Sequence, residues 1–240
     1  MALITTKAIV LSTLKYGDTS LIVRCFTLEE GLKSYLLKGI LSSKKGKLKS
    51  AYFQPLTQLK IEANHNNKGR LNSIKEVHIT NPYQHIHTNI YKQTIVLFLS
   101  EILSNSIQEE EENSLLFSYL ENAFTWLDTH DKISNFHLLF LLNLTKYLGF
   151  YPDIANMGFE YFNLLDGKFT NNSLGLELLS GDKLVLLKTL LGTSFDSIDS
   201  IQFNKNERQV VLQVIIRYFE LHLDGFKKPK SLGVLETVFS

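Results

Sequence analysis

The hydrophobic period of the chain changes near residue 80, and this change constrains the fold more than any other feature. Before it, short β-rich segments alternate with turn residues, which predicts strands over residues 4–14, 20–27, 32–37, 53–63 and 70–79. Five short antiparallel strands fit a small barrel, because closing the sheet hides edges that would otherwise pair with other chains.

After Asn81-Pro82 the apolar residues recur at spacings of three and four. This period predicts helices over residues 90–106, 114–127, 135–148, 182–191 and 207–223. The intervening segment 151–175 is less helical, and Asp166-Gly167 within it predicts the turn of a short hairpin. The pattern therefore indicates an α+β chain in two modules, a strand-rich one over residues 1–80 and a mainly helical one over residues 81–240.

The charges divide at the same place. The first 80 residues carry 13 Lys and Arg against 5 Asp and Glu, and the other 160 carry 12 against 19, so a net charge of +1 hides a basic part and an acidic part. A basic module next to an acidic one suggests different partners for the two. Nucleic acid is the first polyanion to consider for the basic module.

The single cysteine and the absence of long apolar runs indicate in which cellular compartment the protein functions. Cys25 lies in an apolar run, which predicts a buried structural thiol. Because it is the single cysteine of the sequence, an intrachain disulfide and a Cys-based zinc cluster are excluded. The N-terminus lacks the apolar region of a signal peptide, and no stretch approaches 18 uninterrupted apolar residues. We expect a soluble cytoplasmic protein without a membrane partner.

Signals for catalysis are weak. The chain has no phosphate-binding glycine loop and no Gly-x-Ser-x-Gly elbow. His85 and His87 have no third metal ligand nearby in sequence, so ordinary loop histidines are favoured. Asp128, His130 and Asp131 favour a helix start over a catalytic group. We therefore nominate no catalytic residue and no cofactor.

The basic module combines cations with aromatic residues. Single-stranded nucleic acid needs both, because cations follow the phosphates and rings stack on bases at about 1–3 kcal/mol per base. The alternative is that the lysines solubilise a loop while the rings fill a barrel core, as we expect for Phe53. The pattern alone leaves both interpretations open. The residues concerned are Arg24, Lys33, Lys38, Lys44, Lys45, Lys47, Lys49 and Arg70, with Tyr35, Tyr52 and Phe53 between them.

A series of short motifs, in order and at similar spacing along nearly the whole chain, resembles the RecO family of bacterial recombination mediators. No single motif is diagnostic, but their order makes coincidence improbable. The motifs are Lys7-Ala8-Ile9-Val10-Leu11, Tyr16-Gly17-Asp18-Thr19-Ser20-Leu21, Phe26-Thr27-x-Glu29-x-Gly31, Leu37-Lys38-Gly39, Phe53-Gln54-Pro55-Leu56, Glu101-Ile102-Leu103, Tyr147-Leu148-Gly149-Phe150-x-Pro152-Asp153, Tyr218-x-x-x-His222-Leu223 and Lys230-Ser231-Leu232.

The resemblance implies an N-terminal OB-like barrel, a helical domain and a non-enzymatic role in DNA repair. RecO proteins bind single- and double-stranded DNA, anneal strands, and act with RecR to load RecA on DNA coated by single-stranded-DNA-binding protein, whose C-terminal tail they contact. Many members carry a zinc ribbon after the motif that ends at Asp153. This chain has no cysteines there, so no metal is expected, and packing through Phe159, Tyr161, Phe162 and Phe169 would replace it.

The resemblance also suggests where DNA binds. OB folds bind strands across the face of strands two and three and its flanking loops. The residues expected there are Arg24, Lys33, Tyr35, Lys38, Lys44, Lys45, Lys47, Lys49 and Arg70. For the partner tail, which needs an apolar pocket and a cation, Lys146 is a candidate, although a solvated helix lysine is an equal interpretation. Two other classes stay open: a scaffold whose barrel binds protein, and a nuclease whose acidic residues converge only in three dimensions.

Overall fold

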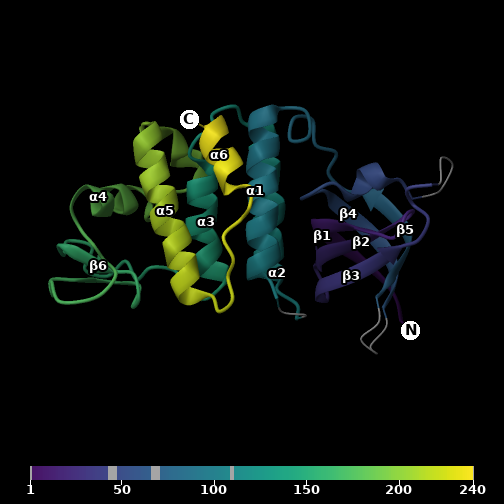
Figure 1. Cartoon of the computed structure of the whole chain (residues 1–240), viewed down its shortest axis with the longest axis horizontal. Coiled ribbons are helices and arrows are strands. Elements are labelled where there is room, and N and C mark those ends of the chain that lie inside the picture. The colour runs from purple at the N-terminus through teal and green to yellow at the C-terminus, as the bar shows by residue number, and fades with distance from the viewer. Residues whose placement is uncertain (1, 43–47, 66–70, 109–110, 240) are drawn as a thin grey trace. The chain divides into compact units, whose positions relative to one another are not determined.

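The computed structural model describes residues 2–42, 48–65, 71–108 and 111–239 (Figure 1). Its contacts divide the chain into two compact units. One comprises Met1–Thr129 with Pro229–Ser231, and the other His130–Lys228 with Leu232–Ser240. The change of secondary structure after residue 80 thus falls inside the first unit, and the division into modules 1–80 and 81–240 stays a prediction.

Five strands of the first unit form one antiparallel sheet with the order β3-β2-β1-β4-β5. They are β1 (Ala2–Tyr16), β2 (Ser20–Thr27), β3 (Gly31–Leu37), β4 (Gln58–His65) and β5 (Ser73–Ile79). Asn72, just before β5, closes the sheet against β3: its N–H donates to the Ser34 carbonyl at 3.0 Å, and its carbonyl accepts from Leu36 N at 2.9 Å. The predicted five-stranded OB-like barrel is confirmed.

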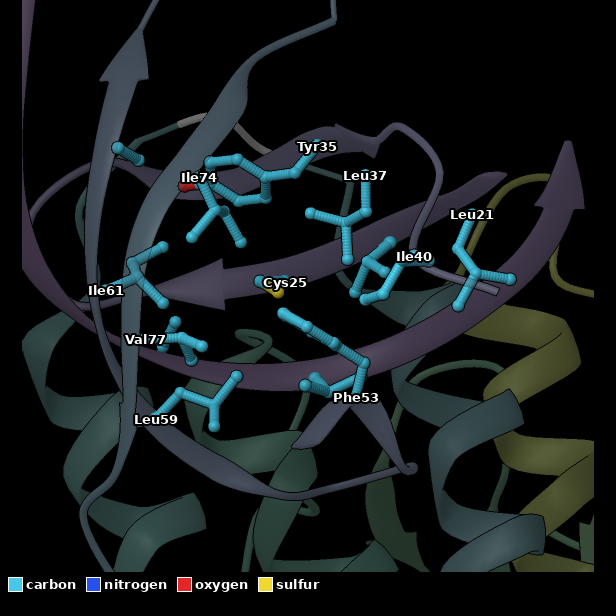
Figure 2. Packing of buried hydrophobic residues seen from close by; sticks show 14 residues of the cluster. Leu21, Cys25, Tyr35, Leu37, Ile40, Phe53, Leu59, Ile61, Ile74 and Val77 are labelled. Atoms are coloured by element: carbon cyan, nitrogen blue, oxygen red, sulfur yellow. The ribbon is translucent and has the colours of Figure 1, made fainter. Parts of the chain in front are cut away.

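The interior of the barrel is filled by residues of all five strands, which alternate along β1 to β4 and are three apart in β5, where the pairing with β4 shifts (Figure 2). Val23 and Cys25 of β2, Tyr35 of β3 and Ile61 of β4 are each fully buried. Burial alone raises the pKa of the Cys25 thiol to about 12, so the thiol stays protonated and inert, as predicted. Phe53 packs in the same core and is 2% exposed.

The fourth strand begins five residues later than predicted. Residues Ser50–Phe53 form a short 3₁₀ helix, η1, Pro55 offers no N–H to a ladder, and Leu56 has a φ of +60°. These residues therefore break the strand, and β4 starts at Gln58.

Two helices complete the first unit, α1 (Ile90–Ser106) and α2 (Ser114–Thr129). They pack on the barrel where Phe26 of β2 meets Phe117 of α2, with ring centroids 5.9 Å apart, and where Lys7 Nζ lies 3.1 Å from Glu121 Oε1. Asp128 lies in the last turn of α2 and does not start a helix, which corrects the prediction. Its carboxylate instead accepts the backbone N–H groups of residues 84–86, just before α1.

The second unit is built around α3 (Phe136–Tyr147), which is buried on almost all sides. The helices α4 (Gly181–Leu190), α5 (Lys205–His222) and α6 (Leu232–Val238) and the 3₁₀ helix η2 (Phe195–Ser200) accompany it. A capping box formed by Asn204 and Glu207 starts α5. The sequence pattern missed η2 and α6, because both are too short to show a helical period.

The predicted hairpin is confirmed in the insert. Strands β6 (Tyr161–Asn163) and β7 (Lys168–Thr170) pair antiparallel, and β8 (Leu178–Leu179) pairs with β6. Phe162 and Phe169 are buried in an edge-to-face pair with centroids 4.9 Å apart, and the Phe162 centroid lies 6.1 Å from the Tyr218 ring. Aromatic packing therefore holds this insert on α5.

Gly167, in the β6–β7 turn, combines a φ of +64° with a close approach to α5. A Cβ at this position would lie 2.5 Å from Tyr218 Oη, whereas Gly192 has a φ of +78° and no atom within 4 Å. We expect Gly192→Ala to lower the free energy of unfolding by about 1–2 kcal/mol, and Gly167→Ala by roughly a further 1–3 kcal/mol from overpacking. Chemical denaturation followed by circular dichroism measures both.

Tyr218→Phe provides the control for this prediction, because it removes the hydroxyl that the new Cβ would meet. In that background the cost of Gly167→Ala should fall to that of Gly192→Ala. An unchanged cost would mean that the contact with Tyr218 is not the source of the strain.

Candidate nucleic-acid interface

Strand register separates the inner and outer faces of β1, β2 and β3. Leu21, Val23 and Cys25 of β2 face the core, so the alternate residues of β2 face outward. Cross-strand partners share a face, which defines three outward rows. These rows are Ser12–Arg24–Ser34, Leu14–Ile22–Leu36 and Tyr16–Ser20.

Arg24 lies on the outer face, and Lys38 lies at its edge, in the turn after β3, where Gly39 N donates to Ser20 Oγ at 3.3 Å. Arg24 is partly exposed and Lys38 is exposed. Within the described part of the chain neither forms an ion pair with a carboxylate, and none of the three rows contains an acidic residue. The acidic residues nearest in sequence are Glu29 for Arg24 and Glu30 for Lys38, and Glu30 contacts His65 and Lys33 instead. Both cations can therefore meet an anion without first losing a partner.

Tyr35 and Lys33 share the inner face of β3, and the burial of Tyr35 corrects its assignment to a DNA-binding surface, while the DNA contact of Lys33 stays a prediction. Tyr35 is fully buried, and its hydroxyl lies 2.8 Å from His65 Nε2, while His65 Nδ1 lies 2.5 Å from Glu30 Oε2. Lys33 pairs in register with the buried Cys25, and its ammonium lies 4.0 Å from Glu30. A ring enclosed in the barrel cannot stack on a base, so Tyr35 leaves the candidate set.

The other predicted cations are placed only in part. Lys49 is exposed at the start of η1, beside Tyr52, which packs partly against the core. Lys44, Lys45, Lys47 and Arg70 lie outside the described residues, and their role in DNA binding stays a prediction from sequence.

Sequence analysis missed an aromatic and an aliphatic residue on the outer face. Tyr16 is 54% exposed and Leu14 is 66% exposed, although both lie in a strand. Leu41 lies close to them in the fold, because its N–H donates to the Thr19 carbonyl in the turn that follows Tyr16. The sequence signal that could have identified them is the alternation of faces along β1. Leu14 and Tyr16 are two residues apart and therefore share a face.

Lys146, the candidate for the partner tail, is exposed near the end of α3. The Lys146 ammonium lies over the Tyr151 ring, 4.5 Å from the centroid. Its partial desolvation lowers the pKa of Lys146. A cation beside an apolar ring is the chemistry expected for a contact with the partner's tail. Lys146 therefore stays a proposed contact.

The second unit also contains a groove of about 980 Å³ between α4, α5 and β8. Leu178, Leu186 and Val214 are among its apolar lining residues. Its charged lining is acidic on balance, because the two cations Lys183 and Arg217 are outnumbered by the carboxylates of Glu177, Asp182 and Glu207. Arg217 is moreover held by Glu177 at 2.5 Å and by Glu220 at 3.3 Å. An acidic tail is therefore poorly matched to this groove.

Neither a metal cluster nor a membrane span is present in the part of the chain that the structure describes. The described residues bring together no three His, Cys, Asp or Glu side chains that could hold an ion, and none of their helices is long and apolar enough to cross a bilayer. The acidic convergence that a metal-dependent nuclease needs is thus not found among them.

The closed barrel of five antiparallel strands, with a partly exposed outer face over β1, β2 and β3, defines an OB-fold protein. Folds of this class bind oligonucleotides or oligosaccharides across that face. The chain belongs to the RecO family of DNA repair proteins. The model described as "Recombination protein O N terminal" matches residues 1–83, and that described as "Recombination protein O C terminal" matches residues 87–232.

Proteins named "DNA repair protein RecO" are similar to the chain over nearly its whole length. That of Flavobacterium johnsoniae is 54% identical over 237 residues, and that of Flavobacterium psychrophilum 52% identical over 237 residues, each covering 99% of both chains. The protein of Bacteroides fragilis is 38% identical over 239 residues, with 98% of both chains covered.

Proposed function

We propose that this chain is a non-enzymatic recombination mediator, which binds single- and double-stranded DNA, anneals complementary strands, and acts with RecR to load RecA on DNA coated by single-stranded-DNA-binding protein. The observation that carries the proposal is its membership in the RecO family over the full length. The acid-free outer face with Arg24 and Lys38 supports the DNA-binding part.

The test of this function uses the full-length chain and a fluorescent single-stranded oligonucleotide. A mediator should bind it reversibly and leave its length unchanged over hours, and should speed the annealing of a complementary strand. Shortening of the oligonucleotide would indicate a nuclease. Absence of binding at low salt would favour the alternative in which the barrel binds protein.

We predict that removing Arg24 and Lys38 reduces the salt dependence of binding. If four or five phosphates are neutralised, log K should fall against log salt with a slope near −3, at about 0.7 per phosphate for single strands. Arg24→Gln with Lys38→Gln should lower the magnitude of that slope by roughly 1.4. Fluorescence anisotropy over a series of salt concentrations measures it.

The matched control is Lys60→Gln with Lys75→Gln, which changes the net charge equally on exposed positions of β4 and β5. Its slope should stay closer to that of the wild type. If both double variants change the slope equally, Arg24 and Lys38 would attract DNA only through the net charge of the chain. The outer face would then not be the binding site. Replacing Lys44, Lys45, Lys47 and Lys49 by Ala tests the remaining predicted cations.

For the partner tail we predict that Lys146→Ala weakens binding of a peptide matching the C-terminus of single-stranded-DNA-binding protein. One exposed ion pair corresponds to a loss of roughly two- to fivefold in affinity. Lys183→Ala, on the groove between α4 and α5, serves as the control and should have no effect. Calorimetry on the full-length variants measures both affinities. Weaker binding by Lys183→Ala, with Lys146→Ala unchanged, would show that the tail binds in the groove.

A further inference from the structure

The outer face of β1, β2 and β3 carries an exposed ring beside its cations, and this ring suggests more than phosphate binding. Tyr16 is 54% exposed in the row with Ser20, and Lys38 lies in the turn after the neighbouring strand β3. The adjacent row adds Leu14, which is 66% exposed. Large apolar side chains in strands are usually buried, so their exposure together indicates a surface for a partner with apolar faces.

The spacing on the sheet fits a partner that combines apolar faces with negative charge. Tyr16 pairs with Ser20, and Gly39 N donates to Ser20 Oγ at 3.3 Å, so Lys38 is one residue away from a contact with the cross-strand partner of Tyr16. Arg24 lies four residues beyond Ser20 along β2, or about 13 Å. One ring thus has cations on two sides of it within a small area.

The charge of the face selects the partner. Arg24 and Lys38 form no ion pair with the described carboxylates, and Asp18 is exposed in the turn beyond Tyr16. A polymer with one negative charge and one flat ring per repeat complements this arrangement. Unpaired nucleotides fit it, because bases in a duplex are stacked on each other and offer no free ring face except at the ends.

We infer that Tyr16 stacks on an unpaired base and thereby makes the outer face of the barrel prefer single-stranded over double-stranded DNA. The inference rests on the proposed function and deepens it, because it assigns strand preference to one residue. Arg24 and Lys38 contact phosphates that both forms of DNA possess, so they supply affinity without this preference.

The test compares Kd values of full-length variants for a single-stranded oligonucleotide and a duplex of the same length. Tyr16→Ala should weaken single-strand binding about 5- to 100-fold, as expected for one lost stack. Duplex binding should change less than about twofold, and the salt slope should not change, because no charge is removed. Tyr16→Phe, which keeps the ring, should bind as the wild type does, and Tyr16→Leu should resemble Tyr16→Ala.

Tyr91→Ala provides the matched control, since Tyr91 is 50% exposed on α1 and does not lie on the barrel strands. A second readout is photocrosslinking of an oligonucleotide that carries 5-iodouracil, with the attachment site found by mass spectrometry. Attachment to Tyr16 is expected.

The inference is overturned if Tyr16→Ala binds single strands within twofold of the wild type, or weakens duplex binding by the same factor. If Arg24→Gln with Lys38→Gln still reduces affinity and slope, DNA binding by the barrel stands and only the stacking role fails. If the wild type binds neither form of DNA, the proposed function fails as well, and the exposed ring would belong to a protein contact.

Discussion

Replacing Asp128 by Ala should lower the free energy of unfolding by about 3–5 kcal/mol, the range found when one partner of a buried charged network is removed. Its side chain is buried in α2 and accepts three backbone N–H groups, from Gln84 at 2.9 Å and from His85 and Ile86 at 2.8 Å each. Lys92, which is 1% exposed, donates to the backbone carbonyl of the same residue at 2.7 Å. Loss of the carboxylate leaves buried donors without their acceptor.

The pH dependence gives this prediction a second readout. Burial alone would raise the pKa of Asp128, but the three N–H donors, together with Lys92, lower it below the ordinary value of 3.8. The folded state therefore gains stability from this carboxylate above pH 3.8 and loses it as the pH falls through the lowered pKa.

Asp128→Asn, which keeps the shape but not the charge, should lose that part of the acid sensitivity. Asp131→Asn, at an exposed position three residues away, is the control and should cost less than about 0.5 kcal/mol. Denaturant titrations at pH 7 and pH 3 compare the variants. Equal costs at residues 128 and 131 would show that the contact between α2 and residues 84–86 adds little stability.

A second large effect is expected at His137 of α3, which should make the second unit sensitive to mild acid. The side chain is 2% exposed, and its ring centroid lies 5.6 Å from that of Phe239. Burial, and then the positive charge of Arg208, lower its pKa from 6.5 to about 3. Lys205 and Glu236 line the same small cavity of about 10 Å³.

The sign of the effect follows from proton binding. Between pH 6.5 and pH 3 the unfolded chain binds a proton at this histidine and the folded chain does not, so stability falls as the pH is lowered through this window. At about 1.36 kcal/mol per pH unit, the loss between pH 7 and pH 4 is roughly 3 kcal/mol. It is added to the losses from carboxylates, which occur at lower pH.

His137→Gln isolates the contribution of the histidine, because glutamine is polar but does not titrate. The variant should be less stable than the wild type at pH 7 and should lose about 3 kcal/mol less between pH 7 and pH 4. His78→Gln, at an exposed position of β5, serves as the control. A wild type and a His137→Gln variant with parallel stability curves over this range would contradict the prediction.

Some elements of the fold could be predicted with their correct bounds because their signals are local. The predicted limits of β2 and α1 are those observed, since turn residues flank β2 and Asn89 caps α1 by accepting the N–H groups of Tyr91 and Lys92. The start of β4 was wrong because Phe53 is apolar, as a strand residue would be, yet fills the core from a 3₁₀ turn. Apolar character identifies a core residue and does not show which backbone carries it there.

The candidate site shows the same limit at the level of side chains. Arg24 and Lys33 looked equivalent in sequence, but strand register places Arg24 outward and Lys33 on the inner face. For the same reason Tyr35, which was predicted to contact DNA, is fully buried, whereas Tyr16, to which the sequence assigned no binding role, is half-exposed. A shift of one residue reverses the face of every side chain in a strand, and register depends on pairing between distant segments.

By itself the sequence determined the class of each module, the basic character of the first one, the lack of thiolates for a zinc ribbon, and the family. The first three follow from composition and local period, and the family follows from the order of short motifs and from the matching family models, none of which needs knowledge of distant contacts. Only the tertiary structure decided that α1 and α2 join the barrel in one compact unit, that Asp128 holds the segment before α1, and which of the rings is exposed. Each of these depends on residues far apart in the chain, whose meeting is set by packing and strand pairing.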